Sequence, residues 1–128
     1  MIRNQLSVFL ENRNGQLCEI TGILAENGIN LNALNIAETI DYGVLRLIVD
    51  DERKAAAVLS EQGYVVSVNP VVTTNVPNVP GGLHGVLSKI TEAGIGVAYM
   101  YSIFGDINGS AQMAFRVEDP EKLENLLK

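Results

Sequence analysis

Asn12-Arg13-Asn14-Gly15-Gln16-Leu17 is repeated 66 residues later as Asn78-Val79-Pro80-Gly81-Gly82-Leu83. Each copy follows an apolar run of the kind that forms a strand, and each opens an apolar segment with helical spacing. Both segments end in a glycine, Gly28 and Gly94, and these glycines are again 66 residues apart. Because loop residues are usually free to vary, a loop that keeps its Asn, Gly and Leu twice in one chain indicates a tandem repeat with a site.

The hydrophobic pattern around the repeated loop gives both halves of the chain the same order of elements. In the first half we predict the order βαββαβ, over residues 6–10, 17–27, 29–38, 44–49, 52–62 and 64–68. The second half repeats it over residues 71–76, 83–93, 95–104 and 111–117, with a last helix from residue 119. Asp119 followed by Pro120 is a typical helix start. The sequence therefore predicts an α+β protein of two βαββαβ units in tandem.

The boundary between the two units falls at Asn69-Pro70, which predicts units over residues 1–70 and 71–128. No flexible linker separates them, which favours a fixed relative orientation. The second unit stops inside its second helix, so its fourth strand is missing, and a neighbouring strand then loses its partner. Either another chain covers that edge or the second unit is less stable than the first, and we expect another chain.

Composition narrows the class of protein. The 128 residues are 47% hydrophobic and 19% charged, which is typical of a globular chain. A net charge of −6 argues against nucleic acid or an anionic membrane as a partner. One cysteine, no signal peptide and no membrane-length apolar run predict a cytoplasmic protein. With one histidine and Cys18 lacking a helper base, we expect no metal and no cofactor.

The duplicated unit and its loop resemble the ACT domain family. The residues that carry the resemblance lie in the two loops and at the strand entries after the helices: Asn12, Gly15, Leu17 and 28–31 in the first copy, and Asn78, Pro80, Gly81, Leu83 and 94–95 in the second. The resemblance implies ferredoxin-like units, each with an antiparallel sheet and helices on one face, in a stand-alone tandem ACT protein. It also implies a regulatory protein that binds an amino acid between two ACT units.

In that family the loop of one unit supplies backbone N–H groups and an amide side chain, and the second strand of the other unit closes the pocket. Carried over to this chain, the resemblance implies that the second-copy loop would face Asn30, which stands at the family's polar position. The first-copy loop would face Gly96 instead, and Tyr99 and Tyr101 would complete that pocket. We therefore predict two amino-acid sites of unequal quality, with the Asn78/Asn30 site the fuller one.

Two other functions remain open at this point. In the first, the loops are architectural, their Asn residues bond their own turns, and the protein is an interaction module that pairs through its exposed sheet edge. In the second, the protein is a small enzyme that uses Tyr99, Tyr101 or His84 as acid or base. No nucleophile elbow, phosphate loop or dinucleotide motif supports an enzyme. We therefore predict a non-catalytic amino-acid sensor that forms a homodimer and acts on a metabolic enzyme or regulator.

Overall fold

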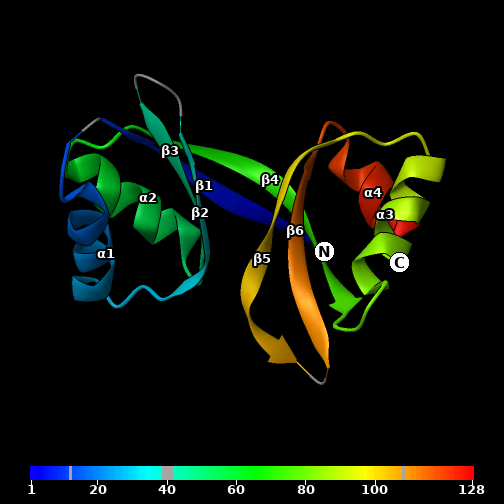
Figure 1. Ribbon diagram of the computed structural model, residues 1–128. Helices are drawn as coiled ribbons and strands as arrows, with labels where there is room; N and C mark the ends of the chain where they lie inside the picture. The colour runs from blue at the N-terminus through cyan, green and yellow to red at the C-terminus, as the bar shows by residue number, and fades with distance from the viewer. Residues whose placement is uncertain (12, 39–41, 108) are drawn as a thin grey trace. The chain divides into compact units, whose positions relative to one another are not determined.

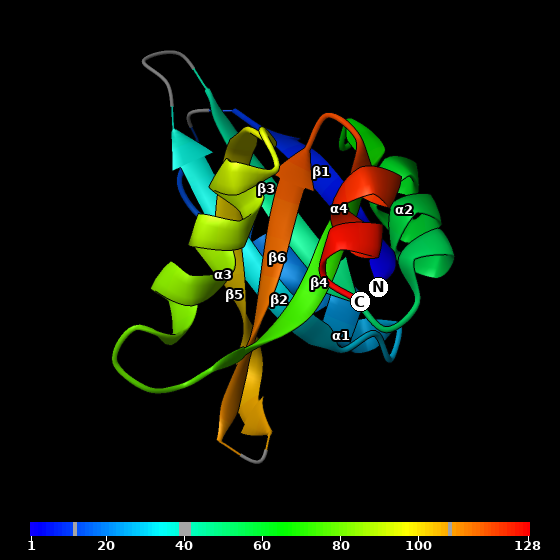
Figure 2. The same ribbon diagram turned by 90° about the vertical axis from the view of Figure 1, so that its right-hand side faces the viewer.

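The computed structural model describes residues 1–11, 13–38, 42–107 and 109–128, and these divide into two compact units (Figures 1 and 2). The first unit spans Asn4–Asn69. The second unit consists of Met1–Arg3 together with Pro70–Lys128. Both are α+β units with antiparallel strands, which confirms the predicted fold class.

The first unit has the predicted βαββαβ order. Its elements are β1 (Ile2–Leu10), α1 (Gln16–Glu26), β2 (Leu31–Glu38), β3 (Gly43–Val49), α2 (Glu52–Glu61) and the beginning of β4 (Val66–Pro77). The strands lie in the order β2-β3-β1-β4. β1 is antiparallel to β3, with Leu6 opposite Leu47, and β2 is antiparallel to the other side of β3.

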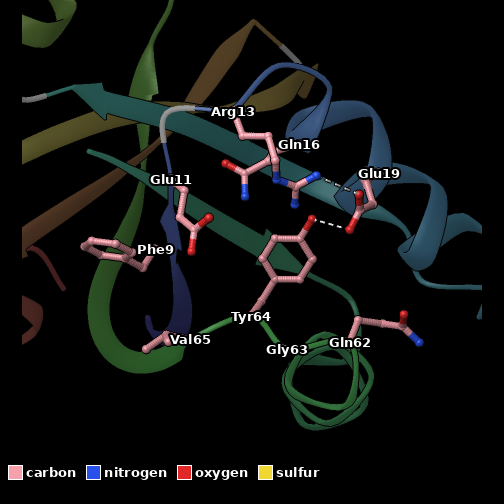
Figure 3. Close-up of a pocket in the computed structure, with 9 residues that line it drawn as sticks. All are labelled: Phe9, Glu11, Arg13, Gln16, Glu19, Gln62, Gly63, Tyr64 and Val65. Carbon is pink, nitrogen blue, oxygen red and sulfur yellow. Dashed lines mark hydrogen bonds and ion pairs between the residues drawn. The ribbon is translucent and has the colours of Figure 1, made fainter. Parts of the chain in front are cut away.

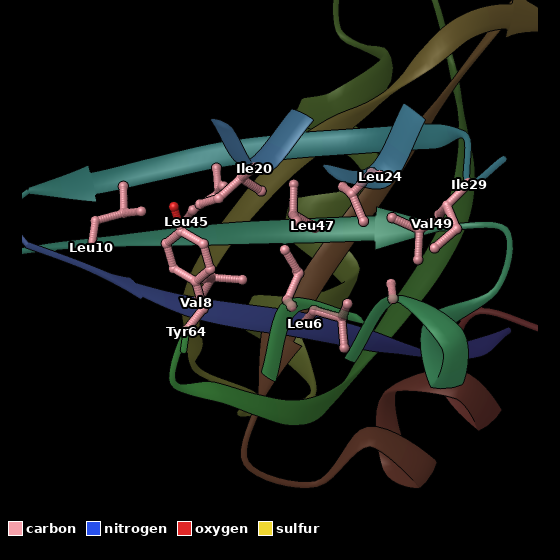
Figure 4. Packing of buried hydrophobic residues seen from close by; sticks show 12 residues of the cluster. Leu6, Val8, Leu10, Ile20, Leu24, Ile29, Leu45, Leu47, Val49 and Tyr64 are labelled. Atoms are coloured by element: carbon pink, nitrogen blue, oxygen red, sulfur yellow. The ribbon is translucent and has the colours of Figure 1, made fainter. Parts of the chain in front are cut away.

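The core of the first unit lies between its sheet and helices α1 and α2, which cover one face (Figures 1 and 4). Leu6, Val8 and Leu10 alternate along β1 and are buried, as period-two patterning requires. Ile20 and Leu24 are four residues apart on α1 and pack into the same cluster. This packing fixes the start of α1, where the repeated loop ends.

The second unit repeats this arrangement with one strand fewer. The later part of β4 is followed by α3 (Gly82–Glu92), β5 (Val97–Ile107), β6 (Ser110–Val117) and α4 (Pro120–Leu126), and the strands lie in the order β4-β6-β5. Figure 2 shows α3 and α4 on one face of β4 and β6. Phe115, Ile90 and Leu123 form the centre of the core there. No strand follows α4 in the described part of the chain, as predicted.

The N-terminal residues occupy the place beside β4 where the missing strand would lie. The backbone N–H of Thr73 donates to the carbonyl of Met1 (2.7 Å), and the terminal ammonium of Met1 donates to the carbonyl of Thr73 (2.8 Å). Ile2 packs against the core of the second unit. At this point the edge is thus covered by the same chain, and the expectation of another chain was wrong here. The sequence predicted a strand from residue 6, and the polar residues Arg3-Asn4-Gln5 hid its true start.

β4 is one strand where the sequence predicted two. The expected strands over residues 64–68 and 71–76 join into Val66–Pro77, and Pro70 lies inside it. The bonds of Val65 with Phe9 and of Thr73 with Met1 show that odd-numbered residues of this segment bond to β1. Pro70 is even-numbered, so the N–H that proline lacks is not needed in that ladder.

Replacing Ile2 by Asn tests the role of the N-terminal segment in the second unit. Placing a polar group against an apolar core should lower the free energy of unfolding by about 1–3 kcal/mol. Urea denaturation of a protein with no residues before Met1 measures the change. Val68→Asn, at a side chain on β4 that is 49% exposed, is the control and should change it by about 0.5 kcal/mol at most. Equal effects of the two substitutions would contradict this role.

Candidate functional site

Both copies of the repeated loop turn through a glycine with positive φ. Gly15 has φ 86° and ψ 0°, and Gly81 has φ 84° and ψ −6°. L-residues with a side chain rarely adopt this conformation, so the turn itself requires glycine. A Cβ built on either residue would have no atom within 4 Å, so both turns are open to an approaching molecule.

The four helices of the described residues begin in two different ways. α2 and α4 each have an Asp side chain as N-cap, with Asp51 accepting from the amide of Lys54 and Asp119 from that of Lys122. α1 and α3, which follow the repeated loops, have no side-chain cap within the described residues. Uncapped N–H groups at a helix N-terminus, together with the helix dipole, favour an anion such as a carboxylate. The repeated loop therefore provides the same potential anion site twice.

The first loop also borders a polar crevice of about 100 Å³ inside the first unit (Figure 3). The hydroxyl of Tyr64, in the turn before β4, donates to the Glu19 carboxylate on α1 (2.7 Å). Arg13 of the loop lies 3.5 Å from the other oxygen of Glu19. These contacts, the Tyr64 hydrogen bond above all, lower the pKa of Glu19. Burial and the bond to Glu19 raise the pKa of Tyr64.

The second loop borders a larger groove, of about 470 Å³, inside the second unit. Gly81, Gly82 and Gly85 line it on one side, and Lys89 places a cationic side chain along the same helix. Gly82 lies so close to the carbonyl of Pro77 that a Cβ there would overlap that oxygen. Backbone and one cation, with few large side chains, thus dominate this groove.

The other predicted site residues are scattered over the surface of the two units. Most are exposed, and these are Asn14, Leu17, Asn30, Asn78, Val79 and Pro80. Leu17 is 40% exposed, although Leu83 at the same position of the second copy packs against the core. Tyr101 is buried and stacks with Tyr99 on β5, their ring centroids 6.4 Å apart. Asn12 lies outside the described residues.

Within each unit, the structure brings the loop together with residues that the sequence did not single out. In the first unit these are Glu11, Glu19 and Tyr64, and in the second Asn75 and Lys89. A comparison at the 66-residue offset would have marked Glu19, because its counterpart is a glycine. The pairing of each loop with Asn30 or with the tyrosines of β5 stays a prediction.

Comparisons with known proteins agree with this architecture. A solved structure, protein BT0572 from Bacteroides thetaiotaomicron, is 42% identical over 99% of this chain and 87% of its own, with a TM-score of 0.92. The ligand-free regulatory subunit of aspartate kinase from Thermus thermophilus has a TM-score of 0.68 at 12% identity, over 99% and 91% of the chains. A structure of aspartokinase alpha and beta subunits has a TM-score of 0.62 at 14% identity, over 98% and 93%. The last two likenesses concern the fold.

The family to which the chain belongs follows from its sequence. The model of the ACT domain pair matches residues 1–127. The chain therefore belongs to the family of ACT domain pairs, as its resemblance to ACT domains predicted. The search of curated proteins gave no match.

Among the described residues, no cluster of three or more His, Cys, Asp or Glu side chains is placed to hold a metal ion. In that same part of the chain, no helix has the length and apolarity that a membrane span needs.

Three glycines of the second loop and helix should respond differently to alanine. Gly82→Ala should lower the free energy of unfolding by about 2 kcal/mol or more, because its methyl group overlaps the Pro77 carbonyl. Gly81→Ala should lower it by about 1–2 kcal/mol through backbone strain alone. Gly85→Ala, with open space inside a helix, should raise it by up to about 1 kcal/mol. Urea denaturation measures all three, and a loss of stability in Gly85→Ala would contradict the geometry.

The contribution of the Glu19–Tyr64 contact should depend on pH. The pKa of the Glu19 carboxyl is lowered in the folded protein. As the pH falls below the ordinary value of 4.5, this carboxyl therefore takes up a proton in the unfolded chain before it does so in the folded protein. The contact therefore stabilises the fold at neutral pH and loses its effect in acid. The difference in urea midpoint between the wild type and Glu19→Gln should narrow from about pH 7 to about pH 3. Tyr64→Phe removes the same hydrogen bond, so the difference in urea midpoint between the wild type and this variant should narrow over the same pH range. A difference that does not change with pH would contradict the stabilising role of the Glu19–Tyr64 contact.

Proposed function

We propose that this protein is a non-catalytic regulatory protein that binds a free amino acid at its repeated loops. The observation that carries the proposal is the contrast between the helices. α2 and α4 begin with an Asp cap, whereas α1 and α3, which follow the loops, have no side-chain cap. Two helices of the chain are thus capped by a side chain. The other two, which follow the two copies of the loop, have uncapped N-termini that can bind a carboxylate.

The second loop offers the groups that an amino-acid head group requires. The amide groups in the first turn of α3 would bind the carboxylate, and Gly81 allows close approach because no atom lies within 4 Å of its Cβ position. The exposed side chain of Asn78 can donate to the carboxylate and accept from the ammonium group. The adjoining groove of about 470 Å³ falls within the range typical of small-molecule sites.

Membership of the ACT domain pair family supports a regulatory role. One solved structure of the same fold is a regulatory subunit of aspartate kinase. In this chain the bound amino acid would shift the protein between two states with different affinity for a partner, which requires that the ligand bind one state more tightly. We further propose that a second ACT unit closes each pocket, that the protein is a homodimer and that its partner is a metabolic enzyme or regulator.

A second function, protein binding through a sheet edge, is favoured by one observation on β4. Because Thr73 directs its N–H and carbonyl towards Met1, alternation along the antiparallel pair directs those of Asn75 the same way. Asn75 is exposed, and no described residue pairs with it on that side. A strand from another protein could bond there.

Calorimetric titration of the full chain with each of the twenty amino acids tests the proposal. One or a few of them should give saturable heat and raise the melting temperature. Asn78→Ala should lower the affinity for that amino acid about tenfold, because one hydrogen bond to a charged group is lost. Asn125→Ala, at an exposed position of α4, is the matched control and should leave the affinity unchanged. No heat and no thermal shift with any amino acid would overturn the proposal and favour binding through the Asn75 edge.

A further inference from the structure

The crevice of the first unit contains a buried acceptor without a partner. Gln16, the first residue of α1, is 5% exposed. Its side-chain oxygen Oε1 has no hydrogen-bond partner within the described part of the chain. Leaving a buried acceptor unpaired costs free energy, so such groups are nearly always satisfied. The unpaired Gln16 oxygen therefore indicates that a molecule in the crevice donates a hydrogen bond to it.

The charges around Gln16 indicate the kind of donor. Arg13 is paired with Glu19, and the Tyr64 hydroxyl donates to the same carboxylate. Among the described residues none forms an ion pair with Glu11, which also lines the crevice. Figure 3 shows the Glu11 carboxylate and the Gln16 side chain beside the same space, with Tyr64 across from them. Two carboxylates against one cation leave this space negative, which favours a cationic donor.

The second copy of the repeat shows that the fold does not need these polar groups. At the 66-residue offset, four of the polar residues that line the crevice, Glu11, Arg13, Gln16 and Glu19, are replaced by Pro77, Val79, Gly82 and Gly85. The second loop nevertheless makes the same turn, with nearly the same φ and ψ at its glycine. The polar groups of the first copy are therefore dispensable for the loop, and a ligand explains why they gather there.

We propose that this crevice binds the ammonium group of a small primary amine. Three N–H donors of the ammonium would meet three acceptors, namely Gln16 Oε1 and the carboxylates of Glu11 and Glu19. Phe9 and Val65 stand at the rim and would contact a short alkyl chain. A space of about 100 Å³ suits such a compact group. A divalent metal fits poorly, because it prefers six or more oxygen ligands and the described residues form no metal-binding cluster.

This inference does not rest on the proposed function, because the crevice lies within one unit and requires no carboxylate on the ligand. The two can fail separately. Binding of an amino acid at the second loop would be seen at the backbone amides of Leu83 and His84. Binding of an amine in the crevice would be seen at the side-chain amide of Gln16 and at Glu19.

NMR titration of the full chain with ethylammonium chloride tests the crevice. The Gln16 side-chain amide should shift with saturation, whereas tetramethylammonium chloride, which has the same charge but no N–H donor, should leave it in place at equal ionic strength. Glu11→Gln should lower the affinity for ethylammonium several-fold, and Gln16→Met should lower it about tenfold or more. Glu61→Gln, an exposed residue of α2 that does not line the crevice, is the matched control and should bind as the wild type does.

Three outcomes would overturn the proposal. The first is a shift that does not saturate, and the second is an equal response to tetramethylammonium. The third is unchanged affinity in Glu11→Gln, a surface substitution that should leave the fold intact even if Gln16→Met does not fold.

Discussion

The positive φ at Gly15 and Gly81 is the constraint on which both candidate sites depend. Each glycine ends the loop after a strand and starts a helix that has no side-chain cap. In α3 the N–H of Gly82 donates to the carbonyl of Val79, so the amides of Leu83 and His84 are the ones left for a ligand. An L-residue with a side chain would resist this conformation, and a capping residue would adopt a different one. The same backbone geometry thus excludes the usual cap and opens the helix to an external anion.

The two copies share this backbone and differ in what surrounds it. In the first copy, Arg13, Glu19 and Tyr64 form a hydrogen-bonded cluster beside the turn. In the second, glycines replace two of the polar positions, and Gly82 is required by its close contact with Pro77. Duplication preserved the main-chain turn, which is set by local sterics, while the side chains beside it were free to diverge. The two loops therefore differ in their surroundings, and the two unequal amino-acid sites stay a prediction.

The sequence predicted what local patterning determines. The repeat, the order of helices and strands, and the glycine turns follow from periodicity and from the demands of positive φ. The pairing of Met1 with Thr73 could not be predicted, because it joins residues 72 positions apart and the polar residues after Ile2 conceal the strand. The contact between Glu19 and Tyr64, 45 positions apart, was missed for the same reason. Leu17 opens the segment with helical spacing, yet it lies outside the buried stripe of Ile20 and Leu24, which the sequence alone did not reveal.

The charge of the whole protein bears on which ligands either site can accept. A net charge of −6 attracts cations and repels anions, but salt screens this field beyond about 8–10 Å. An ammonium group in the crevice would gain from the field and from Glu11 nearby. A simple carboxylate at the start of α3 would be opposed by the field and would depend on local amides and Lys89. A zwitterion carries no net charge, so the field neither attracts nor repels it, and the local groups alone decide its affinity. The uncapped helix of an acidic protein is for that reason better suited to a free amino acid than to an isolated anion.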